Sequence, residues 1–124
     1  MMTPEGRIVA KFVAEVRDRG WEQRKVSYEG RAGAPDRLLL APGFHCFIEF
    51  KAPGKLARLQ QEKEHDRLRK AGFKVFVIDT EDAVRSILNY VASTIEHSRL
   101  RVNDVHERNR VVKVTRRYGG EEIF

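Results

Sequence analysis

The chain has 124 residues, of which 41% are hydrophobic and 34% are charged, and its formal net charge is +6 at pH 7. This length suits one domain with a single modest core rather than two domains, and the positive charge favours a polyanionic partner such as nucleic acid. No apolar run approaches the roughly 20 residues of a membrane-spanning helix, and the first residues lack an apolar signal-peptide core, so we expect a soluble, intracellular protein.

The first predicted element is a helix that begins after Thr3. Thr3 can cap it, Pro4 fits its first turn, and Glu5 suits the positive end of the helix dipole. Apolar residues then recur at three- and four-residue spacing, which predicts one buried stripe along the helix. These residues are Ile8, Val9, Phe12, Val13 and Val16. The helix is expected to end near Gly20.

Three strands are expected next. The first runs from Trp21 to Tyr28, and a glycine-rich loop over residues 29–35 leads into a second strand over residues 36–40. A Pro-Gly turn at residues 42–43 then leads to a third strand over residues 46–51, whose aromatic and β-branched residues predict burial. Cys46, the single cysteine, is interpreted as a small buried hydrophobic residue rather than a catalytic thiol.

Three ionisable side chains are expected to meet on one face of this hairpin. Glu49 and Lys51 project to the same side of the third strand, while Phe50 projects to the other. Folding back at the Pro-Gly turn brings Asp36 beside Glu49. Charges inside a buried strand are costly unless they are paired or bind a metal, and carboxylate oxygens select Mg²⁺ or Mn²⁺. The pattern therefore predicts a small divalent-cation site with a lysine beside it.

The rest of the chain is predicted as helix, strand, helix and a basic tail. A helix over residues 56–71 is dense in charge, so most of it, including His65 and Asp66, is expected to face solvent or nucleic acid. A strand follows over residues 73–78, and then a helix with a buried stripe begins near Thr80. The four histidines show no ligand spacing, which argues against zinc.

The tail over residues 99–124 is treated as a basic extension of the domain formed by residues 1–98. Between Arg99 and Tyr118 it holds many arginines against only two acidic residues. Residues 110–118 have a β-prone, partly alternating pattern. Three interpretations remain open: an extra edge strand, a dimer-swapped arm, and a basic finger along DNA.

These motifs, in their order, resemble the VRR-NUC family of the PD-(D/E)XK nuclease superfamily. The resemblance is carried by Gly33-x-Pro35-Asp36-Arg37-Leu38, by Ile48-Glu49-Phe50-Lys51 and by Gln60, and it covers about residues 5 to 85. It implies an α/β, restriction-endonuclease-like core of order α-β-β-β-α-β. In this chain a further helix and the basic C-terminal extension follow that core.

The resemblance also implies the roles of the site residues. Asp36 and Glu49 would hold Mg²⁺ or Mn²⁺, with the backbone carbonyl of Phe50 completing the shell, and Lys51 would orient a water or stabilise transition-state charge. Gln60 and Glu5 would be outer catalytic participants, Glu5 contacting the metal directly or through a water. Glu15 is an alternative to Glu5.

The implied substrate is branched DNA, including four-way junctions, in the cytoplasm of a bacterium or a phage-infected host. Cutting two opposed strands needs two sites, which favours a symmetric homodimer. Candidate nucleic-acid contacts are Arg24, Lys25, Arg31, Arg37, Lys55, Arg116 and Arg117. Two other readings compete: a noncatalytic DNA-binding module that keeps the nuclease fold, and an RNA-directed nuclease.

Overall fold

The computed structural model describes the backbone of residues 1–114 and the side chains of residues 1–97. The elements follow one another in the predicted order of helix, three strands, helix, strand and helix. They are α1 (Pro4–Asp18), β1 (Glu22–Lys25), β2 (Arg37–Ala41), β3 (Phe44–Phe50), α2 (Leu59–Lys70), β4 (Val75–Ile78) and α3 (Glu81–Val114). Among these described residues, no helix combines the length and the apolar character needed to cross a membrane.

Helix α1 forms as its sequence predicts. The hydroxyl of Thr3 caps it by accepting a hydrogen bond of 3.0 Å from the backbone N–H of Gly6. Its apolar stripe is buried through Ile8, Phe12 and Val16, and this stripe packs on the sheet. Gly20, with φ +76°, lets the chain turn towards β1.

The four strands form one sheet in the order β1-β2-β3-β4. The first three strands are antiparallel, and β4 pairs parallel to β3. The β2–β3 register pairs Ala41 with Phe44 and Arg37 with Ile48, which confirms the predicted hairpin and its turn. Cys46 lies buried in β3, where burial raises the pKa of its thiol to about 12. This agrees with its interpretation as a core residue.

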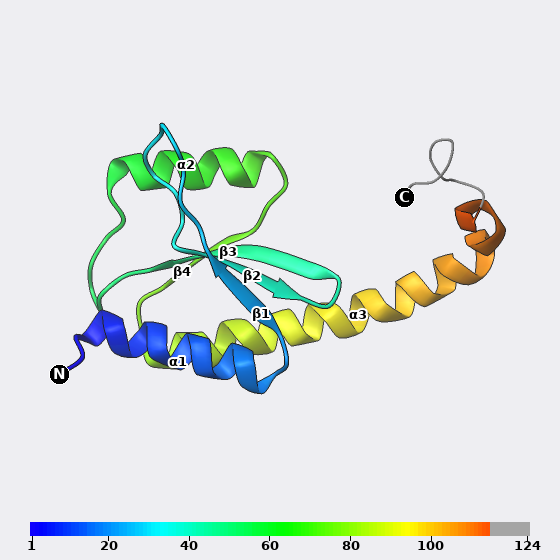
Figure 1. The fold of residues 1–124 in the computed structure, drawn as a ribbon, viewed down its shortest axis with the longest axis horizontal. Coiled ribbons are helices and arrows are strands. Elements are labelled where there is room, and N and C mark those ends of the chain that lie inside the picture. Colours follow the sequence, from blue (N-terminus) through cyan, green and yellow to red (C-terminus); the bar gives the residue numbers. More distant parts are fainter. Residues whose placement is uncertain (115–124) are drawn as a thin grey trace.

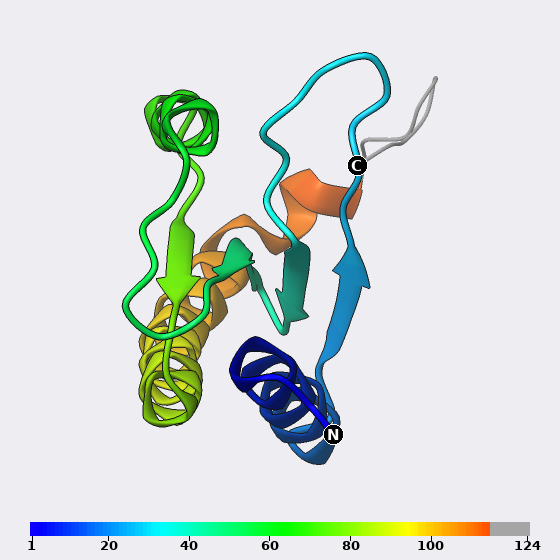
Figure 2. The ribbon, with the colours of Figure 1, turned by 90° about the vertical axis from the view of Figure 1, so that its left-hand side faces the viewer.

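The helices cover the two faces of the sheet unequally. Helices α1 and α3 lie side by side on one face, while α2 lies on the other (Figures 1 and 2). The core forms between the sheet and the two helices α1 and α3. Helix α3 contributes four residues to it, namely Val84, Leu88, Val91 and Ile95. The opposite face, under α2, is left for the polar side chains of β3.

Two features of α2 differ from the sequence-based expectation. The helix begins at Leu59 rather than Leu56, and the side chain of Leu56 is exposed. The prediction that His65 faces solvent is wrong, because His65 and its neighbour Glu64 are the buried residues of this helix. Both face inwards on a helix that is otherwise exposed or half-buried. The dense charge of the sequence had suggested that most of this helix faces solvent or nucleic acid.

The tail begins as a continuation of α3, which runs without a break to Val114. The edge-strand interpretation is therefore wrong for residues 110–114, where the valines had suggested a strand. No glycine or proline interrupts residues 81–114, so helix propagation overrides the local β preference. The remainder of the tail, including Arg116 and Arg117, lies outside the described residues.

Candidate active site

Asp36 lies opposite Glu49 at the end of the β2–β3 hairpin. It immediately precedes β2, and the pairing of Arg37 with Ile48 sets Asp36 across from Glu49. The Oδ2 atom of Asp36 accepts a hydrogen bond of 2.8 Å from the backbone N–H of Phe50. The side chain of Phe50 points to the other face, where its ring packs edge-to-face against Phe12. The structure thus brings the two predicted carboxylates together.

Glu49 is a buried carboxylate with an incomplete set of partners. Its residue exposure is 1%, and its Oε2 atom lies 3.2 Å from Nζ of Lys51. Its other oxygen, Oε1, is buried without a hydrogen-bond partner among the described residues. Burial, and then the nearby charge of Asp36, raises the pKa of Glu49, while Lys51 opposes this rise. Such an unpaired oxygen is costly in an apoprotein and suits a cation ligand.

Of two neighbouring glutamines, the structure brings Gln61 to Glu49 and Lys51, whereas the predicted Gln60 makes no such contact. Gln61 Nε2 donates to Glu49 Oε2 at 2.7 Å, and Gln61 Oε1 accepts from Lys51 Nζ at 2.7 Å. The same Oε1 accepts from the backbone N–H of Arg58 at 3.2 Å, which fixes the amide at the start of α2. Gln60 is exposed. Successive helix residues point about 100° apart, so only one of these neighbours can face β3.

A signal for Gln61 was present in the sequence. Gln61, His65 and Leu68 stand at four- and three-residue spacing, which defines one helix face. The structure places this face towards the sheet, with His65 buried and the other two half-buried. The charged residues around them masked that face in the sequence.

Glu5 lies at the same cleft as Asp36. Both line a pocket of about 290 Å³ between α1 and the ends of the strands, together with Lys25, Arg37 and Phe50. Glu5 is exposed, so it is accessible to a ligand in this pocket.

Glu15 is engaged elsewhere. Its Oε2 atom lies 2.6 Å from Arg85 of α3, and its Oε1 atom lies 3.4 Å from Arg19. The hydrogen bond from Arg85 is the main cause of a lowered pKa of Glu15. Of the two candidate glutamates, the structure therefore brings Glu5 to the cleft.

The predicted nucleic-acid contacts are spread over two sides of the site. Lys25 and Arg37 line the pocket beside Asp36, and Arg37 also donates to Gln23 Oε1 at 2.6 Å. Arg24 forms an exposed ion pair of 2.9 Å with Glu22. Lys55 lies on the other side, at a pocket of about 550 Å³ bordered by α2 and β4.

The loop between β1 and β2 is fastened to α2. The hydroxyl of Tyr28 donates to Glu64 Oε2 at 2.6 Å, and Arg31 donates to Glu64 Oε1 at 3.1 Å. At Gly33, with φ +95°, an added Cβ would lie 3.1 Å from the carbonyl oxygen of Gln60 and 3.1 Å from Cβ of Glu64. A side chain at this position would therefore be strained by the positive φ and crowded by α2. Helix α2 therefore holds both Gln61 and the loop that leads to Asp36.

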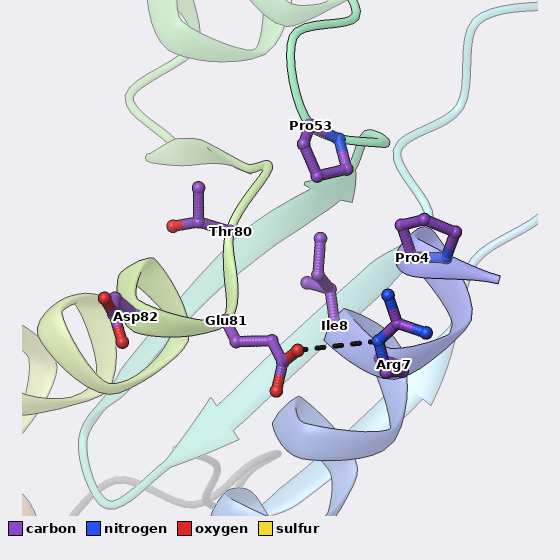
Figure 3. Close-up of a pocket in the computed structure, with 7 residues that line it drawn as sticks. All are labelled: Pro4, Arg7, Ile8, Pro53, Thr80, Glu81 and Asp82. Carbon is purple, nitrogen blue, oxygen red and sulfur yellow. Dashed lines mark ion pairs between the residues drawn. The ribbon is translucent and has the colours of Figure 1, made fainter. Parts of the chain in front are cut away.

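A further pocket, of about 200 Å³, lies where the N-termini of α1 and α3 meet (Figure 3). Arg7 and Glu81 face each other across it at 3.7 Å, and Pro53 and Thr80 border it. Arg7 and Glu81 carry opposite charges and pair with each other. Its lining includes neither Asp36 nor Glu49, so the pocket is separate from the carboxylate pair.

The donor set at the carboxylate pair is small but chemically uniform. Among residues 1–97, no three histidine, cysteine or acidic side chains lie close enough together to hold a metal by themselves. Asp36 and Glu49 nevertheless offer hard oxygen atoms, one of them buried and unpaired. Mg²⁺ commonly binds proteins through one or two carboxylates and keeps several waters. The residues present therefore fit such an ion.

Two comparisons with known proteins found similar chains. No protein-family model matches the chain. It is 42% identical over 79 residues to a protein named "Putative nuclease p44" from Acyrthosiphon pisum secondary endosymbiont phage 1, covering 63% of this chain and 85% of that protein. A solved structure described as "VRR_NUC domain" is 37% identical, with a TM-score of 0.67, and the match covers 71% of this chain and 97% of that one.

Proposed function

Since the chain belongs to the VRR-NUC family of nucleases, we propose that it is a metal-dependent endonuclease that hydrolyses phosphodiester bonds in branched DNA. One observation carries the proposal: Glu49, buried and facing Asp36, keeps one carboxylate oxygen without a partner beside the ammonium of Lys51. A purely structural ion pair would satisfy both oxygens. A site prepared for a cation leaves one available.

Asp36, Glu49 and the carbonyl of Phe50 would hold Mg²⁺ or Mn²⁺, with Glu5 contributing from the edge of the cleft. When bound, the ion would neutralise phosphate charge and lower the pKa of a water. Lys51 is a donor that Glu49 and Gln61 hold in one orientation. It would donate to the attacking water or to the developing charge on the phosphoryl oxygens.

Gln61 acts through Lys51 and Glu49 rather than on the substrate. Its amide donates to the carboxylate and accepts from the ammonium, so it would keep both groups in the geometry that the reaction needs. Hydrogen-bonded partners of this kind commonly change activity or metal affinity by about 10- to 100-fold when they are lost.

The preference for branched DNA and the homodimer rest on symmetry. Within residues 1–97 each chain offers one such carboxylate pair, and a four-way junction must be cut on two opposed strands, so a two-fold pair of chains would place one site at each strand. The helical part of the tail, residues 99–114, holds five lysines and arginines against two acidic residues. Its backbone projects beyond the sheet (Figure 1), which supports its use as a basic arm on DNA.

The test is a cleavage assay with labelled linear duplex, single-stranded, flapped and four-way-junction DNA, and with a junction made of RNA. Each substrate is incubated with Mg²⁺, with Mn²⁺ and with a chelator, beside the Asp36→Asn variant. We expect metal-dependent cuts on branched DNA that the variant does not make. Binding without cleavage in any metal would overturn the proposal in favour of a noncatalytic module, and cleavage confined to RNA would overturn its substrate.

A further inference from the structure

Glu64 holds two arginines on one of its oxygens. Its side chain is 7% exposed, and its Oε1 atom lies 3.1 Å from Arg31 of the β1–β2 loop and 3.2 Å from Arg67 of α2. Its Oε2 atom accepts the hydroxyl of Tyr28 at 2.6 Å. These contacts lower the pKa of Glu64, with the Tyr28 hydrogen bond as the largest cause, so the carboxylate remains charged.

The two arginines face outwards from this anchor. Their side chains are 55% and 59% exposed, although both touch the same buried oxygen. A guanidinium carries five N–H donors, and Glu64 is the only acceptor that either arginine meets within residues 1–97. Two positive charges on one negative charge leave a local excess of one. The arrangement therefore carries a net positive charge and has unused donors.

We propose that Arg31 and Arg67 form a binding site for a backbone phosphate of the DNA, and that Glu64 is the positioning residue of this phosphate site. A phosphate presents several acceptor oxygens, and the planar guanidinium is suited to contacting two of them at once. Because Glu64 already orders both side chains, the phosphate would bind without the entropy cost of ordering two long side chains. This inference rests on the proposed function and names a second contact of the same substrate.

The position of the phosphate site fits a DNA strand that passes the carboxylate pair. Arg67 follows Gln61 by six residues on α2, which is roughly 9 Å along the helix axis at 1.5 Å per residue. Arg31 precedes Asp36 by five residues in the β1–β2 loop, which Glu64 holds against α2. A phosphate bound there would therefore belong to the DNA beside the scissile bond and not to the scissile bond itself.

The test is the salt dependence of binding, measured on a four-way junction in chelator so that no cleavage occurs. Arg31→Gln and Arg67→Gln should each weaken binding by on the order of tenfold and reduce the slope of log affinity against log salt by about one. Lys63→Gln is the matched control, because Lys63 is an exposed charge on the same helix. If both arginine variants behave like this control, the proposed phosphate site is overturned.

Glu64→Gln separates positioning from simple electrostatics. Removing a negative charge near DNA ordinarily tightens binding, and the exposed Glu62→Gln should do so slightly or have no effect. Glu64→Gln should instead weaken binding, because the arginines lose their shared anchor. Tighter binding by Glu64→Gln would overturn its positioning role, and the unfolding midpoint of each variant is measured alongside to exclude loss of the fold.

Cleavage assays on the same proteins keep the two proposals distinct. If the wild type cleaves the junction while both arginine variants bind like the Lys63→Gln control, the phosphate-site proposal fails and the nuclease proposal stands. If the wild type binds without cleaving while the arginine variants show lower affinity and a smaller salt slope, the phosphate-site proposal stands and the nuclease proposal fails.

Discussion

Gln61 is hydrogen-bonded directly to Glu49, with 2.7 Å between its amide Nε2 and the carboxylate Oε2. Gln60, the residue before it, is exposed and turned away from the strand. Gln61→Ala should therefore lower the single-turnover cleavage rate by roughly 10- to 100-fold, while Gln60→Ala should leave the rate within about twofold of the wild type. Equal losses in the two variants would contradict the role given to Gln61.

Lys51 should matter for the reaction and little for binding. Its ammonium is held by Glu49 and Gln61 in a half-buried position, so it contributes a fixed donor rather than a surface charge. Lys51→Ala should reduce cleavage by on the order of 100-fold or more, with DNA affinity in chelator nearly unchanged. The exposed Lys63→Ala serves as the control for loss of charge, and cleavage by Lys51→Ala at the wild-type rate would contradict the assignment.

Gly33 should be the least replaceable glycine of the β1–β2 loop. Its φ of +95° and its approach to Gln60 and Glu64 both oppose a Cβ atom, whereas Gly30 has φ +78° and open space around it. Either alanine would incur backbone strain of about 1–2 kcal/mol. Gly33→Ala should lower the free energy of unfolding further, because the helix must move aside. Urea unfolding of both variants measures the difference, and equal losses would contradict the close packing.

His65 should make stability sensitive to mild acid. Burial, with Arg69 and Lys51 nearby, lowers the pKa of His65 from its ordinary value of 6.5, while Asp66 and Glu64 oppose this change. As pH falls below 6.5, the unfolded chain takes up a proton that the folded His65 does not, so the free energy of unfolding falls. Urea unfolding at pH 7.5 and 5.5 measures this loss. The His65→Leu variant should show a smaller pH dependence, and an unchanged one would contradict the effect.

The sequence predicted the parts of the site that depend on short-range geometry. The Pro-Gly turn and strand alternation were enough to place Asp36 beside Glu49, because a tight hairpin has few possible registers. The choice between Gln60 and Gln61 depends on which face of α2 packs on the sheet, and the surrounding charged residues masked that face in the sequence. A shift of one residue in the start of a helix changes which side chain faces the sheet.

Long-range contacts were beyond sequence reasoning. Arg31 and Glu64 are 33 residues apart, and neither stands in a pattern that indicates a partner. The burial of Glu64 and His65 likewise depends on the loop and the sheet that cover them, and their types favour the surface. At residues 110–114 the local β preference of valine competed with the continuation of α3, and the helix prevailed.

The end of β3 also provides a natural reporter of the site. The backbone N–H of Phe50 is held by the side chain of Asp36, whereas the next amide, that of Lys51, is held by the carbonyl of Ile78 in β4. Hydrogen exchange at Phe50 therefore depends on one carboxylate, and exchange at Lys51 depends on the sheet. Any ligand or substitution that draws Asp36 away would speed exchange at the first amide and leave its neighbour as an internal reference. Two adjacent amide protons would thus separate a change in the site from a change in the fold.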